Sequence, residues 1–118
     1  MNKQTQASHE ERRGLERYPT RAHATLVSDN GTWSAFLLNL SDHGALIAVT
    51  EEHEAELNGN ITLEIELEND SSLIMHGKVA HIKEHFVGLN CAAHGERDEE
   101  RLSLLLKKLA EEDGQEPH

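Results

Sequence analysis

The chain of 118 residues has room for one domain with a single hydrophobic core, and its formal net charge at pH 7 is −11. This charge argues against a surface for DNA, RNA or membrane headgroups, because binding to all three depends largely on Lys and Arg. Hydrophobic residues make up 36% of the chain and aromatic residues 3%, which indicates a modest aliphatic core, such as a small sheet with one helix.

The N-terminal segment stands apart from the rest of the chain. Residues 1–17 are polar and highly charged without a periodic apolar face, so we expect a flexible arm. The stretch EERRGLERYPTR holds four of the eleven basic residues, and no Lys or Arg follows it before Lys78. We therefore expect any anion to bind at these four residues, which are Arg12, Arg13, Arg17 and Arg21.

Period-two alternation predicts a mostly β domain. The segment ITLEIELE places Ile61, Leu63, Ile65 and Leu67 on one face and polar residues on the other, as in a half-buried antiparallel strand. Turn signals divide the remainder into short runs, so six strands joined by tight turns indicate an antiparallel barrel or sandwich. The predicted strands are 21–28, 32–40, 45–50, 61–68, 72–82 and 86–92.

One helix is predicted after the strands. In ERDEERLSLLLKKLAEE four leucines recur at helical spacing, acidic residues occupy the first turn, and Lys107 and Lys108 lie late, matching the helix dipole. The leucine face covers the core or binds a partner. We predict a tail at 1–9, one domain at 10–110 and a second disordered tail at 111–118.

Sequence patterns give little support to catalysis or metal binding. His81 and His85 lie four residues apart, but that spacing brings two imidazoles together only on a helix, and here it crosses a strand end and a turn. Ser41, Asp42 and His43 are neighbours in one turn and cannot form a catalytic triad. We expect no metal, no cofactor and no enzymatic activity.

The location predicted from sequence is a reducing one. A single cysteine, Cys91, cannot form an internal disulfide, and the start MNKQTQASHEE lacks the apolar core of a signal peptide. No apolar run has the length needed to cross a bilayer. These observations favour the cytoplasm.

A second polar motif, NLSDHG, follows a predicted strand. Asn39 and Ser41 alternate at the strand end and so point the same way, and Gly44 permits a backbone conformation that a side chain would forbid. The motif therefore offers small polar groups beside accessible backbone, although an Asn and a Ser can also serve only to fix a turn. Arginine would complement it, because its planar fork matches phosphate oxygens and its flat face stacks on rings.

Together the two motifs resemble those of the PilZ domain, the bacterial receptor for cyclic di-GMP. That family has an Arg pair followed, after three residues, by another Arg, and then Asp or Asn, any residue, Ser, two residues and Gly on the barrel. The matching residues here are Arg12, Arg13 and Arg17 in RRGLER, and Asn39, Ser41 and Gly44 in NLSDHG. The resemblance covers about residues 10–110 and implies a stand-alone, six-stranded antiparallel split barrel with a C-terminal helix and a flexible arm.

The resemblance also implies roles for single residues. Arg13 and Arg17 would grip guanine edges and phosphates, Arg12 would help with a second ligand molecule, and Asn39 and Ser41 would bind a guanine. The family often places Trp where His81 stands, and a His ring could stack on guanine instead.

The sequence departs from the family pattern at the arginines. Glu16 puts an acid between them, and RYPTR gives a second match to the arginine spacing through Arg21. We prefer the first match because it alone has the doubled arginine.

By this resemblance the chain is a monomeric receptor that binds cyclic di-GMP, with an intercalated ligand dimer favoured. Binding would change its conformation and regulate an unidentified downstream protein in motility, biofilm or virulence type processes. One alternative is a degenerate barrel adaptor that binds a protein partner without nucleotide. Another is a metal-dependent hydrolase that uses some of the histidines.

Overall fold

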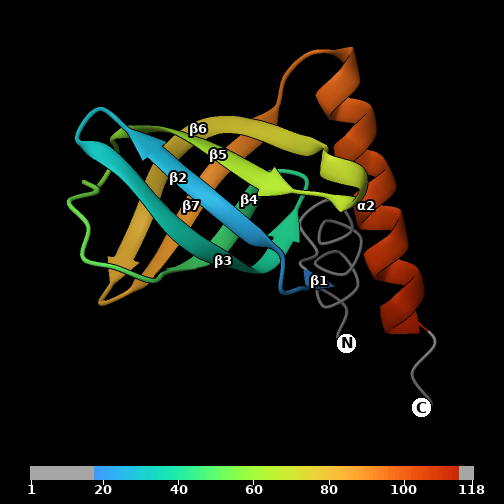
Figure 1. The fold of residues 1–118 in the computed structure, drawn as a ribbon, viewed down its shortest axis with the longest axis horizontal. Coiled ribbons are helices and arrows are strands. Elements are labelled where there is room, and N and C mark those ends of the chain that lie inside the picture. Colours follow the sequence, from blue (N-terminus) through green and yellow to red (C-terminus); the bar gives the residue numbers. More distant parts are fainter. Residues whose placement is uncertain (1–17, 115–118) are drawn as a thin grey trace, which may run out of the picture.

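The computed structural model describes residues 18–114, which form a closed antiparallel barrel with one helix across its end (Figure 1). The strands are numbered in the order in which they occur in the sequence, and a 3-10 turn, η2 (Glu68–Asp70), joins β5 to β6. The elements are β1 (Tyr18–Pro19), β2 (His23–Ser28), β3 (Gly31–Ser41), β4 (Gly44–Val49), β5 (Asn60–Glu66), β6 (Ser72–Lys83), β7 (Phe86–Ala93) and α2 (Glu96–Gly114).

The six long strands close on themselves. The order around the barrel is β3-β2-β5-β6-β7-β4, and β4 pairs again with β3, so that each strand has a neighbour on both sides. Every pairing is antiparallel, as expected for short strands joined by tight turns. The six-stranded antiparallel barrel with a C-terminal helix, predicted from sequence, is therefore confirmed.

The alternation of apolar and polar residues along each strand determines which side chains fill the barrel interior. On β5 the side chains of Ile61, Leu63 and Ile65 are buried, whereas Glu64 and Glu66 are exposed. The same alternation on the other strands fills the barrel with aliphatic side chains. The largest fully buried ones are Leu26, Leu37, Leu40, Ile47, Leu63, Ile65, Leu73, Met75, Leu89, Val49, Val79 and Val87.

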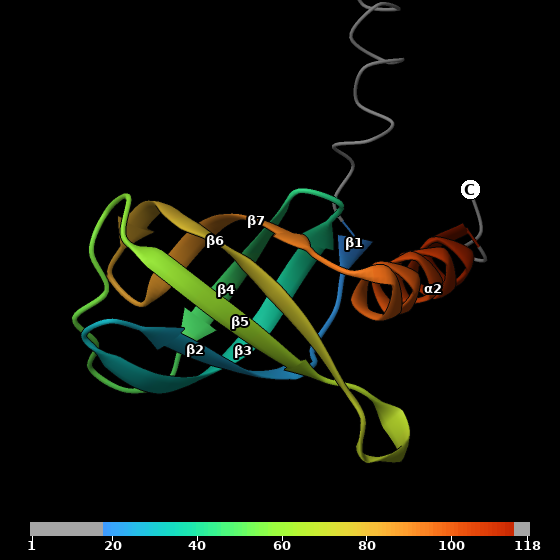
Figure 2. The same cartoon turned by 90° about the horizontal axis from the view of Figure 1, so that it is seen from above.

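Helix α2 covers one end of the barrel and contacts β1, β6 and β7 (Figure 2). Leu102 and Leu109 are buried, and Leu105 and Leu106 pack partly buried against the core, so the leucine face covers the core as one of the two sequence readings predicts. Asp98 accepts a hydrogen bond from the backbone N–H of Ile74 at 3.2 Å.

Several element boundaries differ by one or two residues from those predicted. The first strand begins at His23 and is preceded by the separate strand β1, because the chain shifts along β3 at Pro19–Ala22. The helix continues to Gly114, so that Lys107 and Lys108 do not lie in its last turn. Lys108 instead donates to Glu68 at 3.0 Å, and this hydrogen bond, with the charge of Glu68, raises the pKa of Lys108.

Strands β6 and β7 approach each other closely at Gly77. A Cβ at this position would lie 1.9 Å from the carbonyl oxygen of Asn90 and 2.5 Å from the Cα of Cys91, both backbone atoms of the neighbouring strand. Gly77→Ala should therefore lower the free energy of unfolding by about 1–3 kcal/mol or more, since the two strands must separate. Urea unfolding measures this change.

The matched control is Ala80→Ser, at an exposed position on the same strand, which should change stability by no more than about 0.5 kcal/mol. Equal unfolding midpoints for the two variants would contradict the close approach of β6 and β7.

Candidate functional site

The second sequence motif forms the hairpin between β3 and β4. Asn39 pairs with Leu46 and Ser41 pairs with Gly44, so Asn39 and Ser41 lie on the same face, as predicted. Ser41 is only 3% exposed, and its hydroxyl donates to the carbonyl of Gly44 and accepts from the N–H of His43, both at 3.4 Å. Its observed contacts therefore fix the turn.

The expectation for Gly44 is wrong in one respect. Among the described glycines only Gly31 and Gly95 have positive φ, so Gly44 does not need a backbone conformation reserved for glycine. Gly44 is buried where β3 meets β4.

Strand β1 joins the arginine segment to this hairpin. Tyr18 pairs with Leu40 and Pro19 pairs with Asn39, so the described chain begins directly beside the second motif. Arg12, Arg13 and Arg17 lie outside the described residues. The register of this two-residue strand places Tyr18, the first described residue, beside Leu40 of the second motif.

Asn39 and His81 lie in one transverse row on the outside of the barrel. From Asn39 the row passes through Leu46 on β4 and Gly88 on β7 to His81 on β6, each residue paired with the next. Three strand spacings separate its ends, or about 14 Å. The structure thus brings two predicted ligand residues from distant parts of the chain onto one face, and we call these four residues the ligand row.

The imidazole of His81 lies directly on Gly88. A Cβ at residue 88 would fall 2.0 Å from Cε1 and 2.3 Å from Nε2 of His81. His81 is exposed, so its ring combines a fixed position with an accessible face. This arrangement suits stacking on a flat ring.

Two further rows flank the ligand row on the same face. One contains Lys78, paired with Asn90, which in turn pairs with Gly44. The other contains Phe36 and Phe86, each paired with Ala48. Each flanking row lies two residues along the strands, or about 7 Å, from the ligand row.

Sequence reasoning missed the positions of Lys78, Phe36 and Phe86 in this arrangement. The alternation within a strand shows which residues face outward, but their alignment across strands depends on register, which no local pattern contains.

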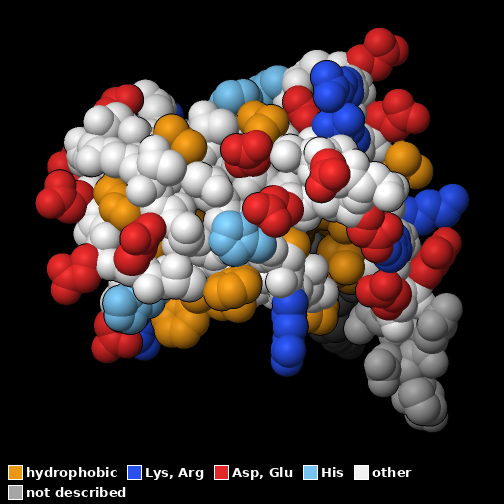
Figure 3. Space-filling model, viewed as in Figure 1, with side chains coloured by type: hydrophobic (Ala, Val, Ile, Leu, Met, Phe, Trp, Pro, Cys, Tyr) orange, Lys and Arg blue, Asp and Glu red, His pale blue; other side chains and the backbone are white. Residues whose placement is uncertain are grey.

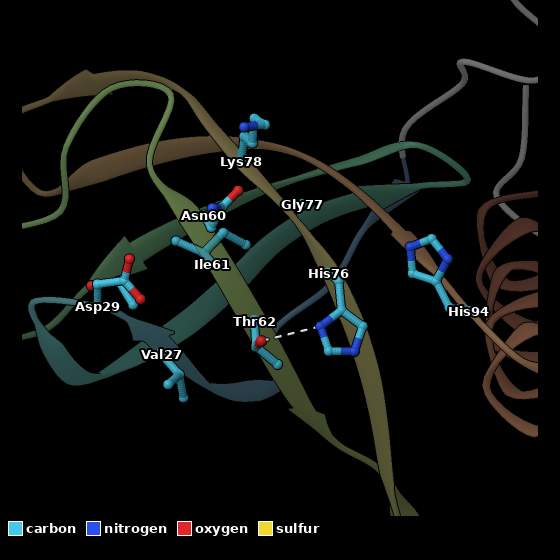
Figure 4. Close-up of a pocket in the computed structure, with 10 residues that line it drawn as sticks. Val27, Asp29, Asn60, Ile61, Thr62, His76, Gly77, Lys78 and His94 are labelled. Carbon is cyan, nitrogen blue, oxygen red and sulfur yellow. Dashed lines mark hydrogen bonds between the residues drawn. The ribbon is translucent and has the colours of Figure 1, made fainter.

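A groove of about 440 Å³ lies on another side of the barrel, over β2, β5 and β6 (Figure 4). Its lining includes Thr62, His76 and Lys78, and Thr62 Oγ1 lies 3.1 Å from Nδ1 of His76. The rings of His76 and His94 lie 5.7 Å apart between centroids, with their planes tilted by 39°, while the Nδ1 side of His76 faces Thr62 (Figure 4). The groove shares only its Lys78 edge with the rows near the second motif, and we place the candidate site on the ligand row.

Two further findings concern the described part of the chain. Within residues 18–114, no three His, Cys, Asp or Glu side chains are grouped so as to hold a metal ion. In the same range no helix has the length and apolar character needed to span a membrane.

Comparison with known families identifies the domain. The model of the PilZ domain matches residues 11–108, which include all three arginines of the first motif and the whole second motif. The chain belongs to the PilZ domain family. PilZ domains are ligand-binding and adaptor domains rather than enzymes, the class of function predicted from the sequence.

A solved structure of the same fold supports this assignment. The chain is similar to the Bacillus subtilis Inhibitor of motility (MotI/DgrA), with a TM-score of 0.67 and 14% sequence identity. The match covers 86% of this chain and 50% of that one, so the PilZ chain described here spans about half the length of that structure. A comparison with curated protein sequences gives no match.

The position of the His81 ring in this PilZ domain depends on residue 88 being a glycine. Gly88→Ala should displace the imidazole, because the new methyl group would occupy the place of the ring. The nuclear Overhauser effects between the His81 ring protons and residue 88 should disappear. Gly59→Ala, whose Cβ would meet no imidazole, is the control, and retention of these effects in Gly88→Ala would show that the ring lies elsewhere.

Proposed function

We propose that this PilZ domain is a receptor for cyclic di-GMP, which it binds between the arginine segment and the ligand row. The observation that carries the proposal is the pairing of β1 with Leu40 and Asn39, because it places Tyr18, the residue that follows Arg17 in the sequence, beside the second motif. The family match supports it, since the matched range contains both motifs.

The chemistry of the two parts complements the ligand. Cyclic di-GMP carries two phosphates and two guanines, and arginine can bind phosphate oxygens with two parallel hydrogen bonds while its plane stacks on a base. The amide of Asn39 can bind a guanine edge, and the His81 ring on Gly88 offers a stacking face. Lys78, one row away, adds a cation for a phosphate.

The net charge of −11 does not prevent this binding. At physiological salt the screening length is about 8 Å, so distant carboxylates act on the ligand far less than arginines in contact with it. A charge-assisted hydrogen bond contributes about 1.5–3 kcal/mol, and micromolar affinity requires about 8 kcal/mol. Three arginines with base stacking are sufficient if few residues become ordered.

Closure of the arginine segment over the ligand would change the surface beside the β3–β4 hairpin. A partner protein could then distinguish the bound from the free receptor, because order gained by one segment creates or hides a binding surface. We propose that this change of surface is the signal by which the receptor regulates its partner protein.

Calorimetric titration with cyclic di-GMP tests the receptor function. Arg13→Ala and Arg17→Ala should each weaken binding by about ten- to a hundredfold, from the loss of one charge-assisted hydrogen bond. The control is Arg97→Ala, which removes an exposed arginine on α2 and should leave the affinity unchanged. Wild-type affinity in both arginine-segment variants would refute the site, and the molar ratio distinguishes one bound ligand from an intercalated pair.

A degenerate adaptor is the second candidate, and the buried hydroxyl of Ser41 favours it, because that group is already engaged by the turn. The adaptor would show no shift in melting temperature at high cyclic di-GMP concentration, whereas a receptor must be stabilised by its ligand.

A further inference from the structure

The nitrogen-bearing edge of the His81 ring lies over Gly88. A Cβ built on Gly88 would fall 2.0 Å from Cε1, 2.3 Å from Nε2 and 2.6 Å from Nδ1, so both ring nitrogens adjoin the space that the glycine leaves open. Gly88 belongs to the ligand row, between Leu46 and His81. The ring therefore leans from β6 over β7 and holds its two nitrogens within the ligand row.

Both nitrogens are available to a ligand. Within residues 18–114 the His81 side chain makes no hydrogen bond and no ion pair, and it is exposed. Other histidines of the barrel are already engaged, since Nδ1 of His76 lies 3.1 Å from the hydroxyl of Thr62 and Nδ1 of His23 lies 3.1 Å from Glu66. His81 thus combines two unengaged nitrogens with a place in the candidate site.

The two strands that lie between Asn39 and His81 carry no formal charge. β4 and β7 contain no Asp, Glu, Lys or Arg. Acidic side chains are instead spread over the face of the barrel that Figure 3 shows, and Glu64 and Glu66 on β5 are among the exposed ones. A ligand in the row therefore meets no carboxylate on the two strands beneath it.

Charged and titratable groups do occur on the elements packed around this row. On the same strand as His81, Lys83 lies two residues along, or about 7 Å away, and Lys78 lies one row away. The nearby turns, the loop after β4 and strand β5 contain Asp42, His43, Glu51, Glu52, His53, Glu54, Glu56, Glu64, Glu66, Glu84 and His85. These groups are present with and without ligand, so the ligand itself decides how the charge of His81 changes on binding.

The chemistry of cyclic di-GMP favours a charged ring. Its phosphate oxygens, and O6 and N7 of its guanines, are hydrogen-bond acceptors. A neutral imidazole has one N–H donor and one acceptor, whereas the imidazolium has two donors. In the proposed site the arginines approach the ligand from the side opposite the ligand row, so the negative phosphates lie between them and the ring. Binding at this edge therefore stabilises the imidazolium.

We propose that His81 binds cyclic di-GMP in its protonated form, so that the receptor takes up a proton with its ligand and binds it more tightly as the pH falls. The inference rests on the proposed receptor function and adds the proton as a second input to it. Because the ligand favours the charged ring, the gain in affinity is complete at low pH. It is lost as the pH rises through the range of about pH 5 to 8 in which histidine changes its charge.

Calorimetric titration of the full chain with cyclic di-GMP, between pH 5.5 and pH 8, tests the proposal. The wild type should bind about fivefold more tightly at pH 5.5 than at pH 8, because a charge-assisted hydrogen bond contributes more than a neutral one. Near pH 6.5 the heat should differ between two buffers of unlike ionisation enthalpy. The sign of that difference should correspond to uptake of part of a proton for each ligand bound.

Two variants assign the proton to one ring. His81→Phe keeps a flat ring for stacking but cannot bind a proton, so it should lower the ratio of affinities between the two pH values to about twofold or less and remove most of the uptake. His76→Phe is the matched control, because His76 is also exposed on β6 but lies outside the ligand row. This control should bind ligand and proton as the wild type does.

The possible results separate this proposal from the receptor function. Binding that is equally tight at pH 5.5 and pH 8, or proton uptake that persists in His81→Phe, would overturn the role of His81 and leave the receptor in place. Loss of the uptake in His76→Phe would assign the proton to the wrong ring and overturn it as well. Absence of binding at every pH would refute the receptor function and this proposal together.

Discussion

The register of β3 determines where β1, β2, β4 and the candidate site lie. Its eleven residues pair with β2 along the first half, with β4 along the second half, and with β1 near Asn39. A bulge between Leu37 and Asn39 lets one strand serve these neighbours while its apolar side chains stay inside the barrel. A shift of one residue would turn Asn39 inward and carry β1 away from the hairpin.

The parts of the fold that were predicted correctly are those with local causes. Alternation on β5 and leucine spacing on α2 follow from which side chains must leave water, and both are confirmed. The strand β1 is only two residues long and is defined by hydrogen bonds to β3, so no periodicity could reveal it. The helical pattern recognised in the sequence ended at Glu112, and the structure continues the helix by two residues to Gly114.

The sequence proposed residues for the candidate site but could not give their layout. The second motif identified Asn39 and the family resemblance identified His81, yet only the pairing of four strands places them in one row. Ser41 illustrates the converse, since its type suggests a ligand contact while its burial and hydrogen bonds serve the turn. The shared row of Phe36 and Phe86 left no local signal, because the two residues are fifty positions apart and are aligned only by their pairing with Ala48.

The closed pairing of the six long strands also bears on how the protein behaves when concentrated. Sheets with free edges present unpaired N–H and C=O groups that recruit strands from other molecules, whereas a closed barrel has no such rim. Among the strands of residues 18–114, each of the six long ones is hydrogen-bonded to a strand on both sides, and the two-residue strand β1 pairs with β3 alone. The barrel can therefore display bare apolar rings to the solvent with little danger that they seed fibrils.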